Sequence, residues 1–438
     1  MLNRIDLRGR SQLSAADLPR PTIAGDEPRA AVRSIIDEVR GHGDAAVRQL
    51  TERFDGVALE QLAVPAEQLD AAVDQLDGRL RAAFEEAIAS IDTFHQHQVR
   101  APELIERSGM TIRAYQRPMR RAGLYVPGGR AAYPSTVLMT AVPARVAGVD
   151  EIALCVPPDR RIGGIAPSVL AAARLAGVDE VYAVGGAQAI AAMAYGTESI
   201  APVDVIAGPG NVYVAIAKQE VAGDVGIAAA FAGPSEVVVV ADETSDPTYV
   251  AIDLIVQAEH GPDGLAWLVT WDEAVVDAVC AAGDSLLEDA TRADDVRSTM
   301  AAGGYAAIVD GEEAALAVVN AIAPEHLEVQ TGTAESFAER VDNAGAIFCG
   351  SLAPASIGDY LAGPSHVLPT YGSARFSSAL TVGDFTKDQH IVTVDRDGLE
   401  RFGPHVIALA ETEGLDAHAE SIRLRLAAAA ASVARENS

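Results

Sequence analysis

The sequence predicts an α/β fold built on parallel sheets, and three observations lead to this prediction. A helix–strand unit occurs twice: residues 134–156 and 167–184 each run Pro-Ser, an apolar helix, Gly-Val-Asp-Glu and an apolar strand. Further short apolar strands are expected at residues 203–207 and 236–241. A second alternating region covers about residues 246–350. Strands that alternate with helices in this way form doubly wound parallel sheets.

The first part of the chain, up to about residue 120, is charged and mostly helical in pattern. Residues 27–54 place apolar side chains mostly three and four positions apart, which is typical of an amphipathic helix. Residues 69–97 show a second helical pattern, with acidic side chains and arginines on the expected solvent face.

The repeated helix–strand unit contains expected helix start and stop signals. Ser135 and Ser168 follow the two prolines, and a serine side chain can cap the first turn of a helix. Gly148 and Gly177 are expected to end the two helices, since glycine adopts the left-handed conformation common after a last turn. Ligands of such sheets bind beyond the carboxyl ends of the strands.

The second alternating region begins with Asp246 as an expected N-cap and Pro247 at the first helical position, and Gly261-Pro262 is expected to stop that helix. Its strands are expected at residues 265–271, 306–309 and 346–349. Residues 351–385 are loop-rich. From Leu415 onward the tail is predicted to form an Ala-rich helix that can lie on a neighbouring subunit.

Length and composition limit the function. The 438 residues are enough for two to four domains. The net charge of −29 repels phosphate backbones and anionic headgroups, so neither a nucleic acid nor a membrane surface is expected as a partner. The three cysteines are far apart, and the N-terminus lacks the apolar core of a signal peptide. We expect a cytoplasmic protein with no membrane-spanning helix.

Two short strings in the second half combine imidazole with amide or carboxyl groups. In VQAEHG, Gln257 and His260 share a helix face and offer half of a metal site, whereas the alternative is a histidine favoured by the helix dipole. In APEHLE, Glu325 and His326 are neighbours in an expected loop or turn. The pair can perform acid–base chemistry near neutral pH, or it can be a capping glutamate with an incidental histidine.

Two later strings add further polar groups. In the loop GDYLAGPSHVLPT, Asp359 offers a hard oxygen ligand and His366 a hydrogen-bond donor, although both can belong to a series of tight turns. Glu413 and His418 lie just before and within the last helix, where a surface histidine often has no special role. Together, Gln257, His260, Asp359 and His418 would form a nitrogen and oxygen zinc set with room for substrate.

Three glycine-rich turns adjoin expected strands of the first α/β region. They are LYVPGG at residues 124–129, VGGAQAI at residues 184–190 and AGPGNVYV at residues 207–214. Each turn could let the backbone approach a pyrophosphate, or could lead into a helix whose N-terminus binds the pyrophosphate. Each can equally be an ordinary turn between a strand and a helix. Ser235 and Glu236, before a buried strand, add a polar turn to the same region.

Taken in order, these strings resemble the histidinol dehydrogenase family over nearly the whole chain. The resemblance rests on LYVPGG, VGGAQAI, GPGNVYV, AGPSEVVVVAD, QAEHG, APEHLE, GDYLAGPSHVLPT, ARFSSAL and the terminal EGLDAH. It implies a zinc-dependent and NAD-dependent oxidation of L-histidinol to L-histidine through L-histidinal, the last step of histidine biosynthesis. It also implies a homodimer with shared active sites and one Zn²⁺ per subunit.

The resemblance assigns roles to the matched positions. The implied catalytic pair is Glu325 and His326. The implied metal ligands are Gln257, His260, Asp359 and His418, the last donated by the partner subunit. The implied substrate contacts are Ser235, Gln257, His260, His326, Asp359, His366, Glu413 and His418. The implied NAD contacts are Tyr125, Gln188 and Asn211.

The expected architecture has two Rossmann-like, doubly wound domains with small N- and C-terminal helical extensions. Two copies of the chain would form an intertwined dimer. Residues 1–25 would be an N-terminal extension. Residues 26–122 and 236–376 would form a discontinuous first domain with the catalytic and metal residues. Residues 123–235 would form the NAD-binding domain, and residues 377–438 would complete the partner's site.

The residue types suit this chemistry. A neutral imidazole is a natural base for the hydroxyl proton, so we assign it to His326, while Glu325 would activate water for the aldehyde step. Zinc would mainly orient the substrate through its imidazole and amine nitrogens.

Several alternatives remain open from the sequence. They are a zinc hydrolase without NAD, a non-enzymatic small-molecule-binding protein, and a dehydrogenase of another amino alcohol. A thiol mechanism would need Cys155, Cys280 or Cys349, and none of these lies in a matched string.

Overall fold

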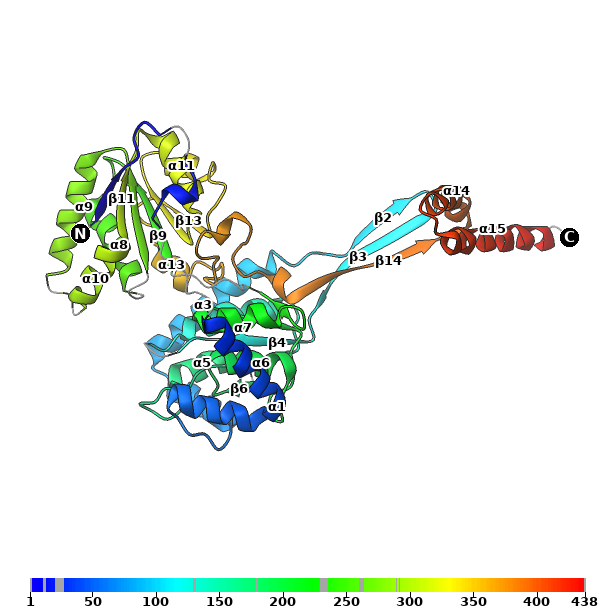
Figure 1. Ribbon diagram of the computed structural model, residues 1–438, viewed down its shortest axis with the longest axis horizontal. Coiled ribbons are helices and arrows are strands. Elements are labelled where there is room, and N and C mark those ends of the chain that lie inside the picture. Colours follow the sequence, from blue (N-terminus) through cyan, green and yellow to red (C-terminus); the bar gives the residue numbers. More distant parts are fainter. Residues whose placement is uncertain are drawn as a thin grey trace. The chain divides into compact units, whose positions relative to one another are not determined.

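The computed structural model describes residues 2–10, 13–19, 27–128, 131–178, 180–228, 235–259, 264–288, 290 and 292–436 (Figure 1). The chain divides into two compact units. The first unit comprises Met1–Gln98 and Met119–Phe385, and the second comprises Val99–Pro118 and Thr386–Ser438. Within the described residues, no helix is both long and apolar enough to cross a membrane.

A five-stranded parallel sheet occupies one part of the first unit, with strand order β6-β5-β4-β7-β8. Its strands are β4 (Arg121–Tyr125), β5 (Glu151–Cys155), β6 (Glu180–Tyr182), β7 (Val205–Ala207) and β8 (Gly226–Ile227). The helices around it are α1 (Glu27–Asp55), α2 (Ala66–Asp74), α3 (Gly78–Gln96), α4 (Pro134–Val146), α5 (Pro167–Leu175), α6 (Gly186–Tyr195) and α7 (Val212–Val221).

Successive residues of these strands alternate between two apolar cores. Leu124 and Leu154 pack with α2–α5, whereas Tyr125 and Cys155 pack with α1, α6 and α7. Side chains alternate across a strand, so a sheet buried on both faces requires apolar residues at nearly every position. The continuous apolar runs of the sequence are thereby explained, and the doubly wound arrangement is confirmed for this sheet (Figure 1).

A six-stranded parallel sheet forms the other part of the first unit, with strand order β1-β11-β10-β9-β12-β13. Its strands are β1 (Asn3–Asp6), β9 (Glu236–Ala241), β10 (Leu265–Thr270), β11 (Gly304–Ile308), β12 (His326–Gln330) and β13 (Ala346–Cys349). Its helices are η1 (Ala15–Asp17), α8 (Pro247–Ala258), α9 (Glu273–Leu286), α10 (Ala293–Gly303), α11 (Glu312–Ile322), α12 (Ala334–Ala338) and α13 (Ala355–Tyr360), and η2 (Ser373–Arg375) and η3 (Val382–Phe385) follow.

This sheet is also covered on both faces. Val237 and Val239 of β9 pack with α8–α10, whereas Val238 and Val240 pack with α11 and α12. Helix α8 connects the neighbouring parallel strands β9 and β10, so it returns the chain to the amino ends of the strands. The end of α8 therefore lies at the same edge of the sheet as the first residues of β9 and β12.

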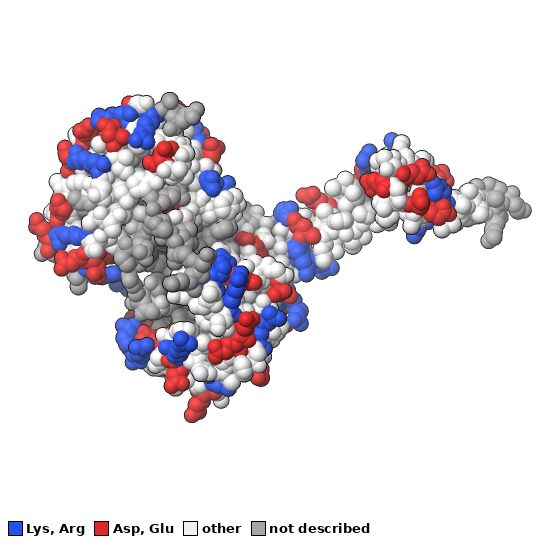
Figure 2. All heavy atoms as spheres, in the orientation of Figure 1, with Lys and Arg blue, Asp and Glu red and all other residues white. Residues whose placement is uncertain are grey.

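The second unit is a three-stranded antiparallel sheet with two helices. The strand order is β14-β3-β2, from β2 (Glu103–Arg107), β3 (Met110–Pro118) and β14 (Thr386–Val394). Helix α14 (Arg396–Thr412) packs against α15 (Asp416–Glu436), where Gly403 lies against Ile422 and Leu426. On the face of the molecule seen in Figure 2, basic side chains are interspersed with acidic ones.

The helix starts of the repeated unit differ from the prediction. Helices α4 and α5 begin at Pro134 and Pro167, so Ser135 and Ser168 are second residues and cap nothing. Proline suits the first helical position because its φ is already helical and its missing N–H is not needed there. The predicted stops are confirmed, since Gly148 and Gly177 follow the helices with φ of 89° and 77°. Asp246 caps α8 through the N–H of Thr248, as predicted.

The structure refines two further expectations for the first part of the chain. The helix expected at residues 69–97 is two helices, because Asp77 accepts hydrogen bonds from Arg79 and Leu80 and starts α3 anew. The stretch before residue 120 also contains the hairpin β2–β3. Its two-residue turn, Ser108-Gly109, has positive φ at both positions, which is the turn that twisted hairpins prefer.

The packing of α1–α3 differs from the domain division expected from the sequence. These helices lie against the five-stranded sheet and its helices, whereas the sequence grouped residues 26–122 with residues 236–376. The reason is the apolar faces of the helices, which pack on α4–α7. The exact domain boundaries stay a prediction. The expected stop at Gly261-Pro262 lies outside the described residues.

Candidate functional site

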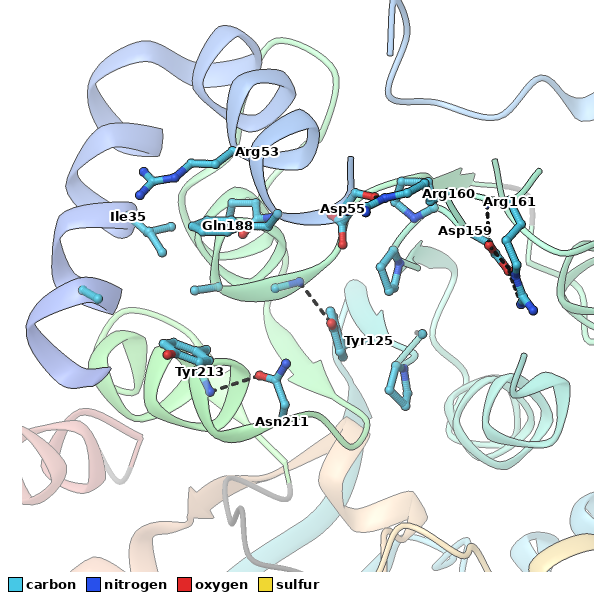
Figure 3. A pocket seen from close by; sticks show the side chains of 18 residues that line it. Ile35, Arg53, Asp55, Tyr125, Asp159, Arg160, Arg161, Gln188, Asn211 and Tyr213 are labelled. Carbon is cyan, nitrogen blue, oxygen red and sulfur yellow. Dashed lines mark hydrogen bonds and ion pairs between the residues drawn. The ribbon is translucent and has the colours of Figure 1, made fainter. Parts of the chain in front are cut away.

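A cavity of about 760 Å³ lies in the first unit, on the α1, α6 and α7 side of the five-stranded sheet (Figure 3). Tyr125 ends β4, Gln188 lies in the first turn of α6, and Asn211 caps α7 directly after β7. All three predicted NAD contacts line this one cavity. It lies at the carboxyl ends of the strands, where ligands of parallel sheets bind.

Tyr125 holds the glycine turn that begins α6. Its buried hydroxyl accepts a hydrogen bond of 3.0 Å from the N–H of Gly186 (Figure 3). Burial raises the pKa of this phenol, so the hydroxyl stays neutral at physiological pH. Gly186 has a φ of 63°, and a Cβ there would lie 2.6 Å from Oε1 of Gln188. Glycine is therefore required beside the cavity.

The two amides of the cavity are in different states. Asn211 Oδ1 accepts the N–H groups of Tyr213 and Val214 at 3.0 and 3.2 Å, which is an ordinary helix cap. Gln188 is 1% exposed, and neither its Nε2 nor its Oε1 has a hydrogen-bond partner among the described residues. A buried amide without partners costs free energy, so a polar ligand in the cavity would stabilise it.

A second cluster lies at the amino ends of strands β9 and β12. His326 is the first residue of β12 and is 8% exposed. Its Nδ1 lies 3.8 Å from Oε2 of Glu325, and its Nε2 lies 3.6 Å from Oδ1 of Asp359 on α13. The imidazole also stacks on Phe348 of β13, with ring centroids 6.3 Å apart. Two carboxylates therefore flank one buried imidazole.

The orientation of this cluster is set by backbone groups. Glu325 Oε2 accepts the N–H of Glu236 at 3.1 Å, which directs the carboxylate toward the start of β9 beside Ser235. Burial disfavours the imidazolium of His326, but the nearby carboxylates of Glu325 and Asp359 outweigh it and raise the pKa to about 9. The imidazole of His326 can accept and release a proton, and the two carboxylates beside it stabilise its positively charged form.

His366 joins this cluster to α4. Its Nδ1 is 2.9 Å from the backbone oxygen of Asp359, and its Nε2 is 3.2 Å from Oγ1 of Thr136. A carbonyl oxygen only accepts, so Nδ1 is protonated and the neutral ring accepts from the threonine hydroxyl at Nε2. The loop after α13 is thereby held in place next to Asp359.

The predicted metal ligands are only partly described. Gln257 is buried near the end of α8, and its Nε2 has no hydrogen-bond partner in the described part of the chain. Oxygen and nitrogen of an amide are assigned from their partners, so this position suits an oxygen ligand equally well. His260 lies outside the described residues, two positions beyond α8.

The remaining predicted residues, Glu413 and His418, belong to the second unit. Glu413 follows the last residue of α14, and His418 lies in the first turn of α15; both are exposed. Among the described residues, no three His, Cys, Asp or Glu side chains are close enough to hold a metal. Among the predicted site residues, the described chain therefore brings together Glu325, His326, Asp359 and His366. The placement of Glu413 and His418 relative to these four stays a prediction.

Sequence reasoning missed a buried polar network behind the imidazole. Gln330 Nε2 donates to Asp253 Oδ2 at 2.7 Å and to Glu328 Oε2 at 3.2 Å. Glu328 Oε1 accepts the N–H of Ala355 at 2.8 Å, the first residue of α13. Burial raises the pKa of Glu328 to about 8 and also raises that of Asp253. The two carboxyl groups therefore retain a proton at neutral pH.

The alternation of residues 326–330 could have indicated this network. His326, Glu328 and Gln330 share one face of β12, whereas Leu327 and Val329 pack into the core on the other face. The loop or turn expected at Glu325 and His326 is therefore corrected for His326, which begins a regular strand, whereas Glu325 lies in the bend just before it. The polar face of this strand supplies both the imidazole and the network behind it.

Comparison with known proteins gives concordant matches. A family model described as histidinol dehydrogenase matches residues 18–426. A histidinol dehydrogenase of Parasynechococcus marenigrum is 49% identical over 395 residues, 90% of each protein. One of Leifsonia xyli subsp. xyli is 46% identical over 433 residues, 97% of this chain and 99% of the relative. The crystal structure of histidinol dehydrogenase from Elizabethkingia anophelis superposes with a TM-score of 0.92 at 34% identity, covering 98% of both chains.

Proposed function

The chain belongs to the histidinol dehydrogenase family and is an oxidoreductase, and on this premise we propose that it oxidises L-histidinol to L-histidine with NAD and zinc. The reaction would pass through L-histidinal and would be the last step of histidine biosynthesis. The observation that supports this best is the buried imidazole of His326 between the carboxylates of Glu325 and Asp359.

In the first step, His326 would accept the hydroxyl proton of the alcohol while the carbon-bound hydrogen leaves as hydride. Bound NAD would supply the hydride acceptor in both steps. The base must be neutral to accept a proton, and Asp359 is one of the charges that raise its pKa. A cation held by Asp359 would oppose that raise, because a bound ion reverses the local charge balance.

In the second step, Glu325 would accept a proton from water as the water oxygen adds to the aldehyde carbon. The resulting hydrate anion would lose its carbon-bound hydrogen as hydride to NAD, which leaves the carboxylic acid. This acid then loses its proton to solvent and becomes the carboxylate of histidine. Glu325 is suited to this role because its Oε2 is already oriented by the N–H of Glu236. General acid–base assistance of this kind contributes about 10²–10⁴-fold to a rate.

The residues present fit zinc in chemistry. Gln257 has a buried amide in need of a partner, and Asp359 has a carboxylate directed at the imidazole. Together with His260 and His418 of a partner subunit they would form a nitrogen and oxygen set. Bound zinc would orient the substrate through its imidazole and amine nitrogens. Ser235, His366 and Glu413 are the further substrate contacts that we propose.

The cavity at the carboxyl ends of β4, β6 and β7 is the proposed site for NAD. Tyr125, Gln188 and Asn211 line it, and the unsatisfied amide of Gln188 is the group that a polar cofactor would complete. The glycine turn held by Tyr125 brings backbone close to the cavity, as dinucleotide sites require.

A homodimer with shared active sites completes the proposal. The second unit exposes large apolar side chains on both its sheet and its helices: Leu104, Ile105, Val392, Leu409 and Leu424 are 50–66% exposed. Large apolar side chains exposed on several elements of one small unit are typical of a surface that a partner covers. A second copy would cover it and would supply His418. We also propose a cytoplasmic location, in agreement with three free cysteines.

The test is NADH formation by purified protein with zinc, NAD and L-histidinol, followed by a count of the histidine formed. We expect two NADH per histidine, loss of activity with a chelator and recovery with zinc. Zinc-dependent hydrolysis without NADH would favour a hydrolase instead. NADH formed only from another amino alcohol would keep the chemistry and change the substrate. If the protein binds neither zinc, NAD nor L-histidinol, the proposed activity is wrong. A non-enzymatic protein that binds another small molecule would then be the better interpretation.

A further inference from the structure

An unpaired carboxylate lies in the cavity among the proposed cofactor contacts. Asp55, the last residue of α1, lines the cavity together with Tyr125 and Gln188. Its Oδ2 is buried and has no hydrogen-bond donor within the described ranges. Figure 3 shows the Asp55 side chain between Gln188 and Arg160 along one wall of the cavity. A hydrogen-bond donor on a bound ligand would satisfy this oxygen.

The arginines of the same wall have other partners. Arg160 donates through Nε to the backbone oxygen of Asp55 at 3.3 Å. Arg161 pairs with Asp159, with an Nη2–Oδ2 distance of 2.6 Å. Burial raises the pKa of Asp55 to about 6, although the charge of Arg160 acts against it. Its buried Oδ2 lacks an orienting donor.

The position of the cavity decides which part of a dinucleotide it would hold. Hydride transfer requires the nicotinamide beside Glu325 and His326, and neither of these lines the cavity. The cavity would therefore hold the adenosine end. Hydrogen-bond donors at that end are the ribose hydroxyls and the adenine amine, whereas a phosphate offers only negative oxygens.

We propose that Asp55 binds the hydroxyl groups of the adenosine ribose and makes this protein select NAD over its 2′-phosphorylated form, NADP. The inference rests on the proposed use of this cavity by NAD. An ionised carboxylate accepts hydrogen bonds from a ribose diol, as acidic residues do in other dinucleotide sites. The same carboxylate repels a 2′-phosphate, because like charges brought together in a partly buried site are unfavourable.

Calorimetric titration of the zinc-loaded protein tests this without measuring activity. The ligands are NAD, NADP, the NAD analogue with a 2′-deoxyadenosine ribose, and the analogue with hypoxanthine in place of adenine. The variant Asp55→Asn removes the charge at constant size. Because it removes a buried, unpaired carboxylate, we expect it to fold at least as well as the parent, which thermal unfolding checks. Asp70→Asn is the matched control, since Asp70 pairs with Arg174 and does not line the cavity.

For the parent protein we expect NAD to bind more tightly than NADP and the 2′-deoxy analogue to bind more weakly than NAD. In Asp55→Asn, NAD affinity should fall by about tenfold, NADP affinity should rise, and the penalty for the missing 2′-hydroxyl should shrink. Asp70→Asn should leave all four affinities unchanged. This pattern would support a ribose contact.

Two results would overturn the inference, and a third would overturn its premise. If Asp55→Asn binds NAD and NADP with the parent's affinities, Asp55 does not contact the cofactor. If the variant instead becomes insensitive to the change from adenine to hypoxanthine, Asp55 contacts the base and not the ribose. If the parent protein binds no NAD at all, the cavity is not an NAD site. The proposed contact between Asp55 and the ribose is then wrong as well.

Discussion

The Nε2 atom of His326 lies 3.6 Å from the Oδ1 atom of Asp359. His326 begins β12, the strand next to the edge strand β13, whereas Asp359 lies on the short helix α13 that follows β13. The same imidazole approaches Glu325 through its other nitrogen at 3.8 Å. Both ring nitrogens thus face carboxylates, and replacement of any of the three groups should affect proton transfer in a different way.

Replacement of His326 by asparagine should remove the first oxidation. The amide has a similar size but cannot accept a proton at neutral pH, so the rate of NADH formation from L-histidinol should fall by at least about 10²-fold. NAD affinity, measured by calorimetry, should change much less than the rate, because the cavity proposed for the adenosine end does not include His326. A variant that keeps the parent rate would remove His326 from its role as base.

Replacement of Glu325 by glutamine should harm the aldehyde step more than the alcohol step. The glutamine oxygen can still accept the N–H of Glu236, so the backbone arrangement at β9 should survive. What is lost is the capacity to take a proton from water. Single-turnover rates with L-histidinol and with L-histidinal separate the two steps. Equal losses in both would contradict the assignment.

Replacement of Tyr125 by phenylalanine should loosen the turn before α6. It leaves the N–H of Gly186 without its acceptor, and an unsatisfied buried donor costs about 1–3 kcal/mol. We expect a lower unfolding temperature and weaker NAD binding. Tyr213→Phe is the matched control, because Tyr213 lines the same cavity but is 45% exposed. If both variants weaken NAD binding equally, the hydroxyl bond to Gly186 is not the cause.

The exposed apolar surface of the second unit should be covered in solution. Sedimentation should give twice the chain mass of 45.5 kDa. Leu424 lies on α15 and is 62% exposed, so Leu424→Glu should keep the helix, since glutamate is a good helix former, and weaken the dimer. Circular dichroism checks the helix. Activity should fall with dissociation if His418 serves the partner's site, and a fully active monomer would contradict shared sites.

The sequence predicted the sheets better than the site. Strands β9 and β13 have the expected bounds, because a strand buried on both faces is a short, continuous apolar run. Strand β12 was missed, because its buried face is polar and its apolar residues alternate. The sequence pattern does not predict the hairpin β2–β3, because its turn signal is the single pair Ser108-Gly109 at the end of a mostly helical region.

The site could not be located by local patterns for a topological reason. Ligands are expected at the carboxyl ends of parallel strands, and the proposed NAD contacts follow this rule. Glu325 and His326 lie instead at the amino ends of the other sheet, where α8 returns the chain. Asp359 reaches them from a different connection, so their roles came from the family resemblance and not from spacing. No sequence pattern indicates Asp55, because it ends a helix that is far in sequence from every glycine-rich turn, although it lines the same cavity.

The network behind His326 predicts a pH-dependent stability. Glu328 has a pKa of about 8 in the folded protein, compared with about 4.3 in an unfolded chain. A raised folded pKa favours the protonated, folded form, so this contribution to stability is complete below the unfolded pKa and is lost as the pH rises through the folded pKa. Glutamine in place of Glu328 cannot ionise, yet its oxygen can still accept the N–H of Ala355.

The difference in unfolding temperature between the parent and Glu328→Gln should therefore change with pH. From about pH 5 to about pH 9 the parent should lose stability relative to the variant, since Gln330 and Asp253 supply no positive charge for the emerging carboxylate. Glu335→Gln, a change of an exposed carboxylate on α12, is the control and should follow the parent. If the parent and Glu328→Gln stay parallel across this range, Glu328 is ionised throughout and the shared proton is absent. A steady loss of the parent's stability relative to the variant up to about pH 8 would instead show that Glu328 holds its proton in the folded protein, behind the strand that holds His326.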